Sequence, residues 1–172
     1  MEQLRIYRVQ DHYVRYLQSV DSRVQHNKNK RRPYVGIVLY VGEYRYFVPM
    51  ESPKANHANI KPGVHIMPLD HGALGLLGFN NMIPVPDSAL ILFDIDAEPD
   101  PEYAELLRRQ AYFINRNKAD IFNHASSTYY KAVKGNNAFL NRICCSFKAL
   151  EQAAGRYNPN HKPRKRPYNG RS

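Results

Sequence analysis

Two runs of β-branched and aromatic residues, joined by a short turn, constrain the fold of this chain more than any other feature. Tyr34–Val41 and Tyr44–Pro49 flank the dipeptide Gly42-Glu43, a pattern typical of a β-hairpin. Because proline cannot donate a hydrogen bond to a sheet, we expect the second strand to end at Pro49. The polar segment Glu51–Pro62 follows, so the sequence predicts a loop that a rigid hairpin holds in place.

The other apolar runs in the first half of the chain predict further short strands and one helix. Leu4–Val9 alternates apolar and charged side chains, and Asp11 is suited to cap a helix over His12–Val20. Four more apolar runs are separated by turn residues, and the last of them is apolar almost throughout, which predicts a buried strand. These runs are Val64–Leu69, Leu74–Phe79, Met82–Val85 and Ala89–Ile95.

Helical periodicity replaces the strand patterns after Asp100, itself a suitable N-cap. The apolar spacing continues for longer than one globular helix usually extends, so we expect a break near Asn117. Gly135 is a suitable C-cap, and Ser146 is a suitable start for a last helix that ends near Tyr157.

Together these patterns predict an α+β fold. We expect a compact, mostly antiparallel sheet with an N-terminal helix and about three C-terminal helices, in a single domain over residues 1–157. Residues 158–172 contain three prolines, five basic residues and almost no aliphatic ones, which predicts a flexible basic tail.

The formal net charge of +10 is concentrated in two short segments, residues 23–32 and 161–172, neither of which contains an acid. Without their ten basic residues, the chain has 15 basic and 15 acidic residues. Such segments favour a polyanionic ligand. Neither has the apolar face of a helix that lies on an anionic membrane, so nucleic acid is the favoured ligand. The ten residues are Arg23, Lys28, Lys30, Arg31, Arg32, Lys162, Arg164, Lys165, Arg166 and Arg171.

Several other classes of protein are disfavoured. The chain has no apolar run long enough to cross a membrane, and its first residues lack a secretory apolar region. The two cysteines, Cys144 and Cys145, are adjacent and match neither a disulfide nor a zinc pattern, so we expect two ordinary residues at a helix boundary in a cytoplasmic protein.

We expect no metal and no cofactor. His57, His65 and His71 lack the spacing of zinc ligands. Asp94 and Asp96 could hold Mg²⁺, but acids at a strand-to-helix junction are more often caps. Phosphate-loop and dinucleotide-binding motifs are absent from the sequence.

The loop after the hairpin places Ser52, Lys54 and His57 beside the basic residue Arg32. RNA can cleave itself when its 2′-hydroxyl attacks the adjacent phosphorus. Lys54 and Arg32 are suited to neutralise the developing charge, Ser52 to hydrogen-bond the phosphate or the 2′-hydroxyl, and His57 to move a proton. Taken alone, a serine, a proline and a lysine in a loop are more often just a loop.

The order of motifs resembles the ToxN/AbiQ family of type III toxin–antitoxin endoribonucleases, which includes the CptN and TenpN toxins. The resemblance extends over most of residues 4–157, and its most specific part is the Pro-x-x-Ser-Pro-Lys run. The matching segments are Ile6-Tyr7, Asp11–Leu17, Arg32–Leu39, Tyr46–Lys54, Leu74–Leu77, Asn81–Val85 and Arg109–Ile114.

This resemblance implies a strongly twisted sheet of the MazF/Kid toxin type and metal-independent RNA cleavage that leaves a 2′,3′-cyclic phosphate and a 5′-hydroxyl. It implies a repetitive antitoxin RNA that the toxin cuts into pseudoknot units, which bind and inhibit the toxin in a closed protein–RNA assembly. Cellular or phage mRNA is the implied substrate, with phage defence as the implied context.

By position, the family's active-site serine and lysine fall on Ser52 and Lys54, its basic residue before the hairpin on Arg32, and its helix tyrosine on Tyr13. Tyr13 is equally consistent with a core aromatic residue on an amphipathic helix.

Two further residues belong to the candidate catalytic set. Glu51 stands where some relatives have threonine, and its carboxylate could repel phosphate or act as a base. His57 stands where the family often has histidine. The sequence does not assign the general base, for which the candidates are Glu51, His57, Ser52 and Tyr13.

Basic and aromatic side chains are the candidates for RNA contacts, since tyrosines can stack on unpaired bases. Four tyrosines could either stack on RNA bases or pack within a strand or helix: Tyr34, Tyr129, Tyr130 and Tyr157. The same set suits a non-catalytic RNA-binding protein, which is the alternative function. The predicted RNA-binding residues are Lys28, Lys30, Arg31, Tyr34, Lys61, Lys131, Lys134, Lys162, Arg164, Lys165 and Arg166.

Overall fold

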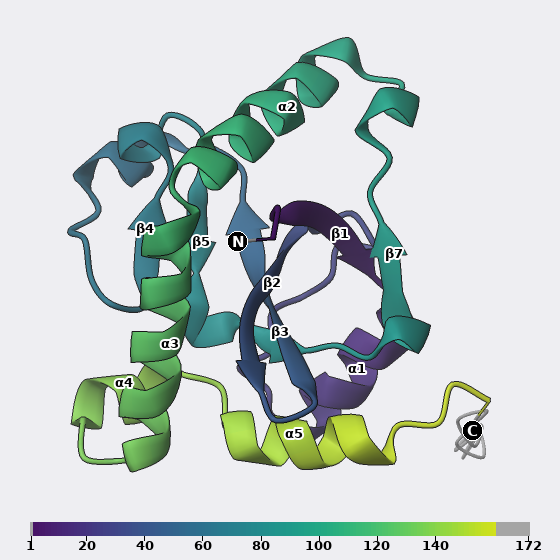
Figure 1. Cartoon of the computed structure of the whole chain (residues 1–172), viewed down its shortest axis with the longest axis vertical. Helices are drawn as coiled ribbons and strands as arrows, with labels where there is room; N and C mark the ends of the chain where they lie inside the picture. The colour runs from purple at the N-terminus through teal and green to yellow at the C-terminus, as the bar shows by residue number, and fades with distance from the viewer. Residues whose placement is uncertain (1, 161–172) are drawn as a thin grey trace, which may run out of the picture.

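The computed structural model describes residues 2–160 and shows an α+β architecture built on one antiparallel sheet (Figure 1). The strands lie in the order β4-β5-β3-β2-β1-β7, and β6 pairs with β3 outside this path. Their bounds are β1 (Arg5–Val9), β2 (Tyr34–Val41), β3 (Tyr44–Glu51), β4 (Ile66–Pro68), β5 (Leu76–Gly78), β6 (Ile83–Pro84) and β7 (Leu90–Leu92).

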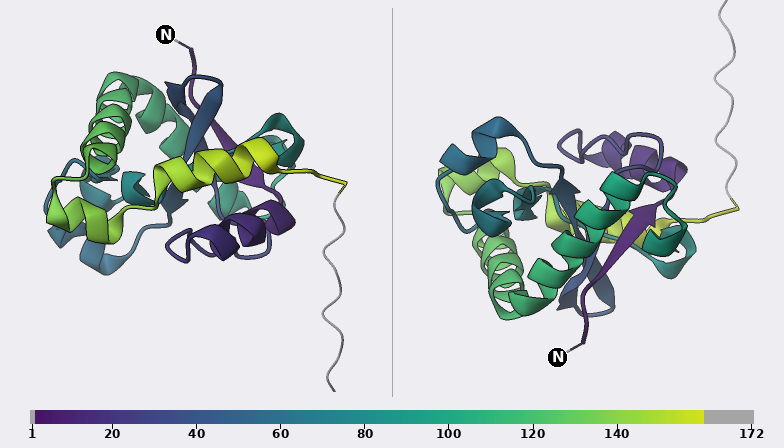
Figure 2. Two further views of the ribbon diagram at one scale, coloured as in Figure 1. Left: turned by 90° about the horizontal axis from the view of Figure 1, so that it is seen from below. Right: turned by 90° about the horizontal axis from the view of Figure 1, so that it is seen from above.

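Helices surround this sheet. In Figure 1, α2 crosses the top of the molecule, α3 and α4 lie at the left beside β4, and α5 runs beneath the β2–β3 hairpin. Helix α1 packs against α5, and Figure 2 shows the two side by side. The bounds are α1 (Asp11–Val20), α2 (Pro101–Arg116), α3 (Lys118–Lys134), α4 (Ala138–Ile143) and α5 (Phe147–Arg156).

The predicted hairpin is confirmed and lies at the centre of the sheet. Its strands pair from Tyr34 opposite Pro49 to Val41 opposite Tyr44. Tyr34, Tyr46 and Phe47 are fully buried, because β2 and β3 have neighbouring strands on both sides and helices over the sheet.

The prediction that β3 ends at Pro49 is wrong. The strand continues for two residues because it changes partners: Met50 and Glu51 pair with Leu77 and Leu76 of β5. The Met50 amide also donates to the Pro33 carbonyl at 3.0 Å. Proline costs the sheet one donor here without ending the strand, and β3 runs to the residue before Ser52.

Local chemistry predicted the later helix boundaries correctly. The Asp100 carboxylate accepts hydrogen bonds from the backbone N–H groups of Glu102 and Tyr103, as an N-cap does. The break falls at Asn117, and Gly135 ends α3 in the left-handed conformation with φ of 77°.

Two expectations about local structure are wrong, and one helix was not predicted. Asp11 is the first residue of α1 and does not cap it, because its carboxylate binds the loop before β2. The run around β7 is an edge strand and not a buried one, with Leu92 53% exposed. The short helix α4 was not predicted; the Asn137 side chain caps it by accepting from the Leu140 amide.

The predicted basic tail begins at residue 158, and its residues from 161 onward lie outside the described part of the chain. The RNA-binding predictions for Lys162, Arg164, Lys165 and Arg166 therefore stay predictions.

A buried carboxylate joins the hairpin to the C-terminal helices. Glu151 of α5 accepts hydrogen bonds from the hydroxyls of Tyr46 at 2.6 Å and Tyr129 at 2.7 Å. Burial, followed by the hydrogen bond to Glu151, raises the pKa of Tyr46 far above its usual value. The hydroxyl therefore stays protonated and donates.

We expect Glu151→Ala to lower the free energy of unfolding by about 3 kcal/mol, because two buried hydroxyls lose a charged acceptor. Urea denaturation measures this, and a double-mutant cycle with Tyr46→Phe should show a coupling of about 1 kcal/mol or more. Lys148→Ala is the control, since this exposed partner of Glu151 should contribute much less to stability than the buried hydroxyls do. Equal losses for both variants would contradict the role of the buried pair.

Candidate active site

Ser52 lies exposed immediately after β3, at the point where that strand pairs with β5. The backbone of Gly75 passes so close that an added Cβ would lie 2.0 Å from the Glu51 carbonyl oxygen, and its φ is +98°. Only glycine permits this approach and this conformation. The position of Ser52 is thus set by the packing of Gly75 and β5 against the end of β3.

Ser52 lines a cleft of about 630 Å³ together with four cationic side chains. Lys28, Arg31 and Arg32 come from the segment before β2, and Arg8 comes from β1. The structure therefore brings two predicted catalytic residues, Ser52 and Arg32, to the same cleft as two predicted RNA-binding residues.

The four cations of this cleft differ in their mobility. Arg32 is only 8% exposed, and its Nε donates to the His26 carbonyl at 2.8 Å. Arg8 lies 3.9 Å from the centre of the Phe93 ring and 3.8 Å from Glu98. Lys28 and Arg31 lie at the exposed surface. The cleft thus combines fixed positive charge with adaptable positive charge.

The loop that presents these cations has an unusual backbone. Lys28, Asn29 and Lys30 have φ values of 52°, 55° and 65°, in the left-handed region that residues other than glycine rarely adopt. The Asp11 carboxylate holds the loop by accepting from the Lys30 amide at 2.9 Å and from the Asn27 side chain at 2.7 Å. Strained backbone of this kind is concentrated at functional sites.

Electrostatic repulsion indicates how closely the cations are gathered. The pKa of Lys28 is lowered chiefly by the positive charge of Arg32, and further by burial and by Lys54, while Glu51 opposes the shift. An anion bound among these groups would relieve their repulsion, so the cleft is suited to a phosphate.

A second cleft, of about 330 Å³, lies beside the segment that contains Ser52. Its lining includes Glu51, Lys54 and His57. Lys54 Nζ lies 4.0 Å from Glu51 Oε2, and His57 Nε2 lies 3.5 Å from the same oxygen. Because Ser52 lines one cleft and Glu51 and Lys54 line the other, consecutive parts of the same segment face the two clefts.

His57 is nearly enclosed, with 2% of its surface exposed. The Lys54 amide donates to its Nδ1 at 3.2 Å, so the proton of the neutral ring is on Nε2, which faces Glu51. Gly72 packs against the His57 backbone, where an added Cβ would lie 2.7 Å from the carbonyl oxygen. This geometry suits a residue that orients Glu51 and Lys54.

The structure does not place the two tyrosines of the predicted site in either cleft. Tyr13 is fully buried, and its hydroxyl donates to the Pro84 carbonyl at 2.5 Å. Tyr34 is also fully buried, and its hydroxyl has no hydrogen-bond partner among residues 2–160. Both positions agree with the core alternative.

Other predicted RNA-binding residues are dispersed. Lys30 and Lys61 are exposed but line neither cleft, and the same holds for Lys131 and Lys134 on α3. Tyr129 is a core residue bound to Glu151, whereas its neighbour Tyr130 is exposed.

Sequence reasoning did not single out Arg8, Asp11 or Asn27 as members of the site. In the sequence, Arg8 is only one of the charged residues in the alternating pattern of Leu4–Val9, and the pairing of β1 with β7 brings it near Phe93. Asn27 is one of several residues of the basic segment that are neither lysine nor arginine, so no charge pattern marks it in the sequence.

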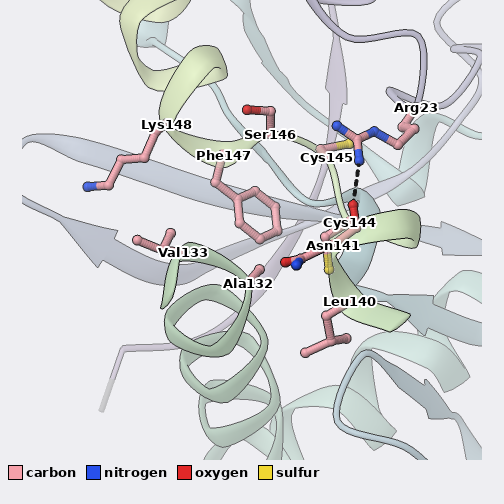
Figure 3. Close-up of a pocket in the computed structure, with 10 residues that line it drawn as sticks. All are labelled: Arg23, Ala132, Val133, Leu140, Asn141, Cys144, Cys145, Ser146, Phe147 and Lys148. Carbon is pink, nitrogen blue, oxygen red and sulfur yellow. Dashed lines mark hydrogen bonds between the residues drawn. The ribbon is translucent and has the colours of Figure 1, made fainter. Parts of the chain in front are cut away.

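Arg23 belongs to the same basic segment but has a structural partner. Its guanidinium donates to both oxygens of Asp21, at 2.9 and 2.8 Å, and Nη1 donates to the Asn141 carbonyl at 3.0 Å (Figure 3). The Ser146 amide also donates to Asp21, at 2.6 Å. These contacts join the basic segment to the turn between α4 and α5.

The adjacent cysteines lie beside this network and line a small pocket of about 240 Å³ (Figure 3). Both thiols are free and buried, and burial raises the pKa of Cys144 to about 11 and of Cys145 to about 12. Protonated, enclosed thiols are poor nucleophiles, in agreement with the prediction of two ordinary residues at a helix boundary.

Within residues 2–160, no three His, Cys, Asp or Glu side chains gather as a metal site would require. No helix among the described residues is both long enough and apolar enough to cross a membrane.

Residues 5–155 match the family model described as toxin ToxN of the type III toxin–antitoxin system. The chain belongs to the ToxN family. It is 32% identical over 163 residues to endoribonuclease ToxN of Bacillus thuringiensis subsp. kurstaki, covering 90% of this chain and 84% of that protein. It is 31% identical over 166 residues to endoribonuclease AbiQ of Lactococcus lactis subsp. lactis, covering 90% of each.

Solved structures of the family share this fold. The structure of AbiQ, a lactococcal anti-phage endoribonuclease of a type III system, matches with a TM-score of 0.80 at 28% identity, over 90% of this chain and 97% of that one. A type III toxin that a non-coding RNA pseudoknot inhibits matches with a TM-score of 0.79 at 27% identity, with the same coverage. The α+β prediction is confirmed, and the comparison with MazF/Kid toxins stays a prediction.

We expect Asp21→Asn to destabilise the protein in a pH-dependent way. Burial alone would raise the pKa of Asp21, but hydrogen bonds from Arg23 and Ser146 outweigh it and lower this pKa. A lowered pKa adds stability above the pKa of the unfolded state, and that stability disappears as pH falls through the folded pKa. The variant should lose about 1 to 2 kcal/mol at pH 7 and progressively less toward acid pH.

Urea titrations between pH 7 and pH 3 measure this difference. Glu105→Gln is the control, since this carboxylate is exposed on α2 and should show no such dependence. A loss for Asp21→Asn that stays constant with pH would contradict the assignment.

Proposed function

We propose that this protein is a metal-independent endoribonuclease, the toxin of a type III toxin–antitoxin system. The observation that supports this most is the exposed Ser52 in a cleft with Arg8, Lys28, Arg31 and Arg32. The two curated relatives at 31% and 32% identity are both named endoribonucleases, which supports the same activity here.

The proposed reaction is an attack of the RNA's own 2′-hydroxyl on the adjacent phosphorus. The 2′-oxygen–phosphorus bond forms, the bond to the 5′-oxygen breaks, and the products are a 2′,3′-cyclic phosphate and a 5′-hydroxyl. Arg32 and Lys54 neutralise the extra charge on the phosphate oxygens, and Ser52 donates a hydrogen bond to one of them.

One proton leaves the 2′-hydroxyl, and solvent water supplies the proton that joins the departing 5′-oxygen. We propose Glu51 as the base for the first transfer. Its side chain is 30% exposed, whereas Tyr13 and His57 are enclosed, and an isolated serine hydroxyl is a weak base. Lys54 and His57, both within 4.0 Å of its carboxylate, orient Glu51.

We propose that the inhibitor is a structured antitoxin RNA. The cationic cleft supports this, and so does the related toxin that a non-coding RNA pseudoknot inhibits. By the family resemblance, repeat-derived pseudoknots and toxins form a closed assembly in the cytoplasm, and the free toxin cuts cellular or phage mRNA. The anti-phage role of AbiQ supports phage defence as the context.

We expect Ser52→Ala and Lys54→Ala each to lower the cleavage rate by about 100-fold or more, because each removes a group that stabilises the transition state. RNA affinity should stay within about threefold of wild type. Single-turnover cleavage of a labelled RNA measures the first quantity and fluorescence anisotropy the second. Ser88→Ala, at an exposed serine, should cleave at the wild-type rate.

Two outcomes would contradict this proposal. A Ser52→Ala, Lys54→Ala double variant that cuts RNA at the wild-type rate would leave a non-catalytic role for the site. Loss of wild-type activity in EDTA, with recovery on adding Mg²⁺, would indicate a metal nuclease instead.

We expect the double variant Lys28→Ala, Arg31→Ala to bind RNA more weakly, and we expect its affinity to depend less steeply on salt concentration. If both cations contact phosphates of a single strand, the slope of log affinity against log salt should fall in magnitude by roughly 1.4. Anisotropy titrations from low to moderate salt measure this slope. Lys131→Ala, Lys134→Ala removes the same charge from α3 and should change the slope less; an equal change would place RNA over α3 as well.

A further inference from the structure

A separate groove lies where α1 packs against the end of α5. Its volume is about 700 Å³, compared with about 630 Å³ for the cleft at Ser52. His12, Arg15 and Tyr16 contribute from α1, and Arg156 and Tyr157 contribute from α5 and the residue after it. None of these residues lines either cleft of the candidate active site.

Aromatic rings form one part of this groove. The Tyr157 ring stacks on His12 with centroids 5.8 Å apart and an interplanar angle of 28°, and its centroid lies 5.6 Å from that of Tyr16. The Tyr157 hydroxyl also hydrogen-bonds His12 Nε2. Tyr16 is fixed by donating to the Ala153 carbonyl at 2.8 Å. The rings are therefore held in place before any ligand binds.

Two arginines form the other part of the groove. Arg15 and Arg156 are exposed, and neither has a hydrogen-bond or ion-pair partner in the part of the chain that the structure describes. The groove lining contains no acid among the described residues. Unpaired guanidinium groups beside fixed aromatic rings are suited to a ligand that has both a planar ring and a negative charge.

We propose that this groove binds an unpaired nucleotide of the RNA, with its base against the Tyr157 cluster and its phosphates on Arg15 and Arg156. This rests on the proposed function only in requiring that the protein binds RNA. The volume is within the range of small-ligand sites. The residues that follow the groove in the sequence are basic, so like charge disfavours the chain's own C-terminus as the occupant.

The groove would extend the RNA-binding surface beyond the active site. Asp11 holds the cationic loop of the active site, and His12, the next residue of α1, lines the groove. The start of α1 thus connects the groove to the loop that presents the cations of the active site. Nucleotides away from the scissile bond would contribute to affinity without taking part in cleavage.

The test uses the full chain with Ser52→Ala and a labelled, unstructured 20-nucleotide RNA of mixed sequence. We expect Tyr157→Ala to weaken binding about tenfold, Tyr157→Phe to restore it, and Arg15→Ala, Arg156→Ala to weaken it about tenfold. The matched control for Tyr157→Ala is Tyr112→Ala, which removes an exposed tyrosine from α2. The matched control for the double arginine replacement is the double variant Arg109→Ala, Arg116→Ala, which removes two exposed arginines from α2. These controls should bind within about threefold of the parent.

Because the arginines are exposed, their replacement tests the site even if Tyr157→Ala fails to fold. Affinity unchanged by the arginine replacement, or lowered equally by the α2 controls, would overturn the proposal. Ribonuclease activity is measured separately on the same variants in the Ser52 background. If the protein with Ser52 cleaves RNA but the groove replacements leave affinity unchanged, the groove proposal alone is rejected. If that protein does not cleave RNA but the groove replacements weaken affinity, the nuclease proposal alone is rejected.

Discussion

The change of partner along β3 is the constraint on which the candidate site depends. As far as Pro49 the strand pairs with β2, and from Met50 it pairs with β5. This places the last strand residue, Glu51, between two parts of the sheet and leaves Ser52 exposed beyond it. A loop attached to a single hairpin would be less well defined, whereas this one begins from main chain that is hydrogen-bonded to two neighbours.

The positive charge of the site is organised by uncharged and acidic groups that do not line its cleft. Asp11 and Asn27 hold a left-handed loop whose conformation is unfavourable for its two lysines, and Asp21 fixes the segment at its other end through Arg23. A flexible basic loop would also attract RNA, but it would lose conformational entropy on binding. Ordering the backbone of this loop in advance lowers that loss and gathers positive charge at the candidate cleft.

Sequence patterns predicted the elements whose signals are local. The hairpin turn, the Asp100 cap and the Gly135 terminus depend on residues close together in the chain, and each is confirmed. The edge position of β7 depends on strand order, which no local pattern contains. For the same reason, the sequence identified Ser52 and Arg32 but not Arg8, which reaches their cleft only through sheet pairing. Burial of Tyr13 also depends on packing between distant segments, because tyrosine suits both a core and a binding surface.

The contact between Gly75 and the Glu51 carbonyl has a genetic consequence. Any side chain at position 75 displaces the strand end that presents Ser52, although Gly75 itself would touch no RNA. We therefore expect a missense change at this codon to impair RNA cleavage, although position 75 lines neither candidate cleft.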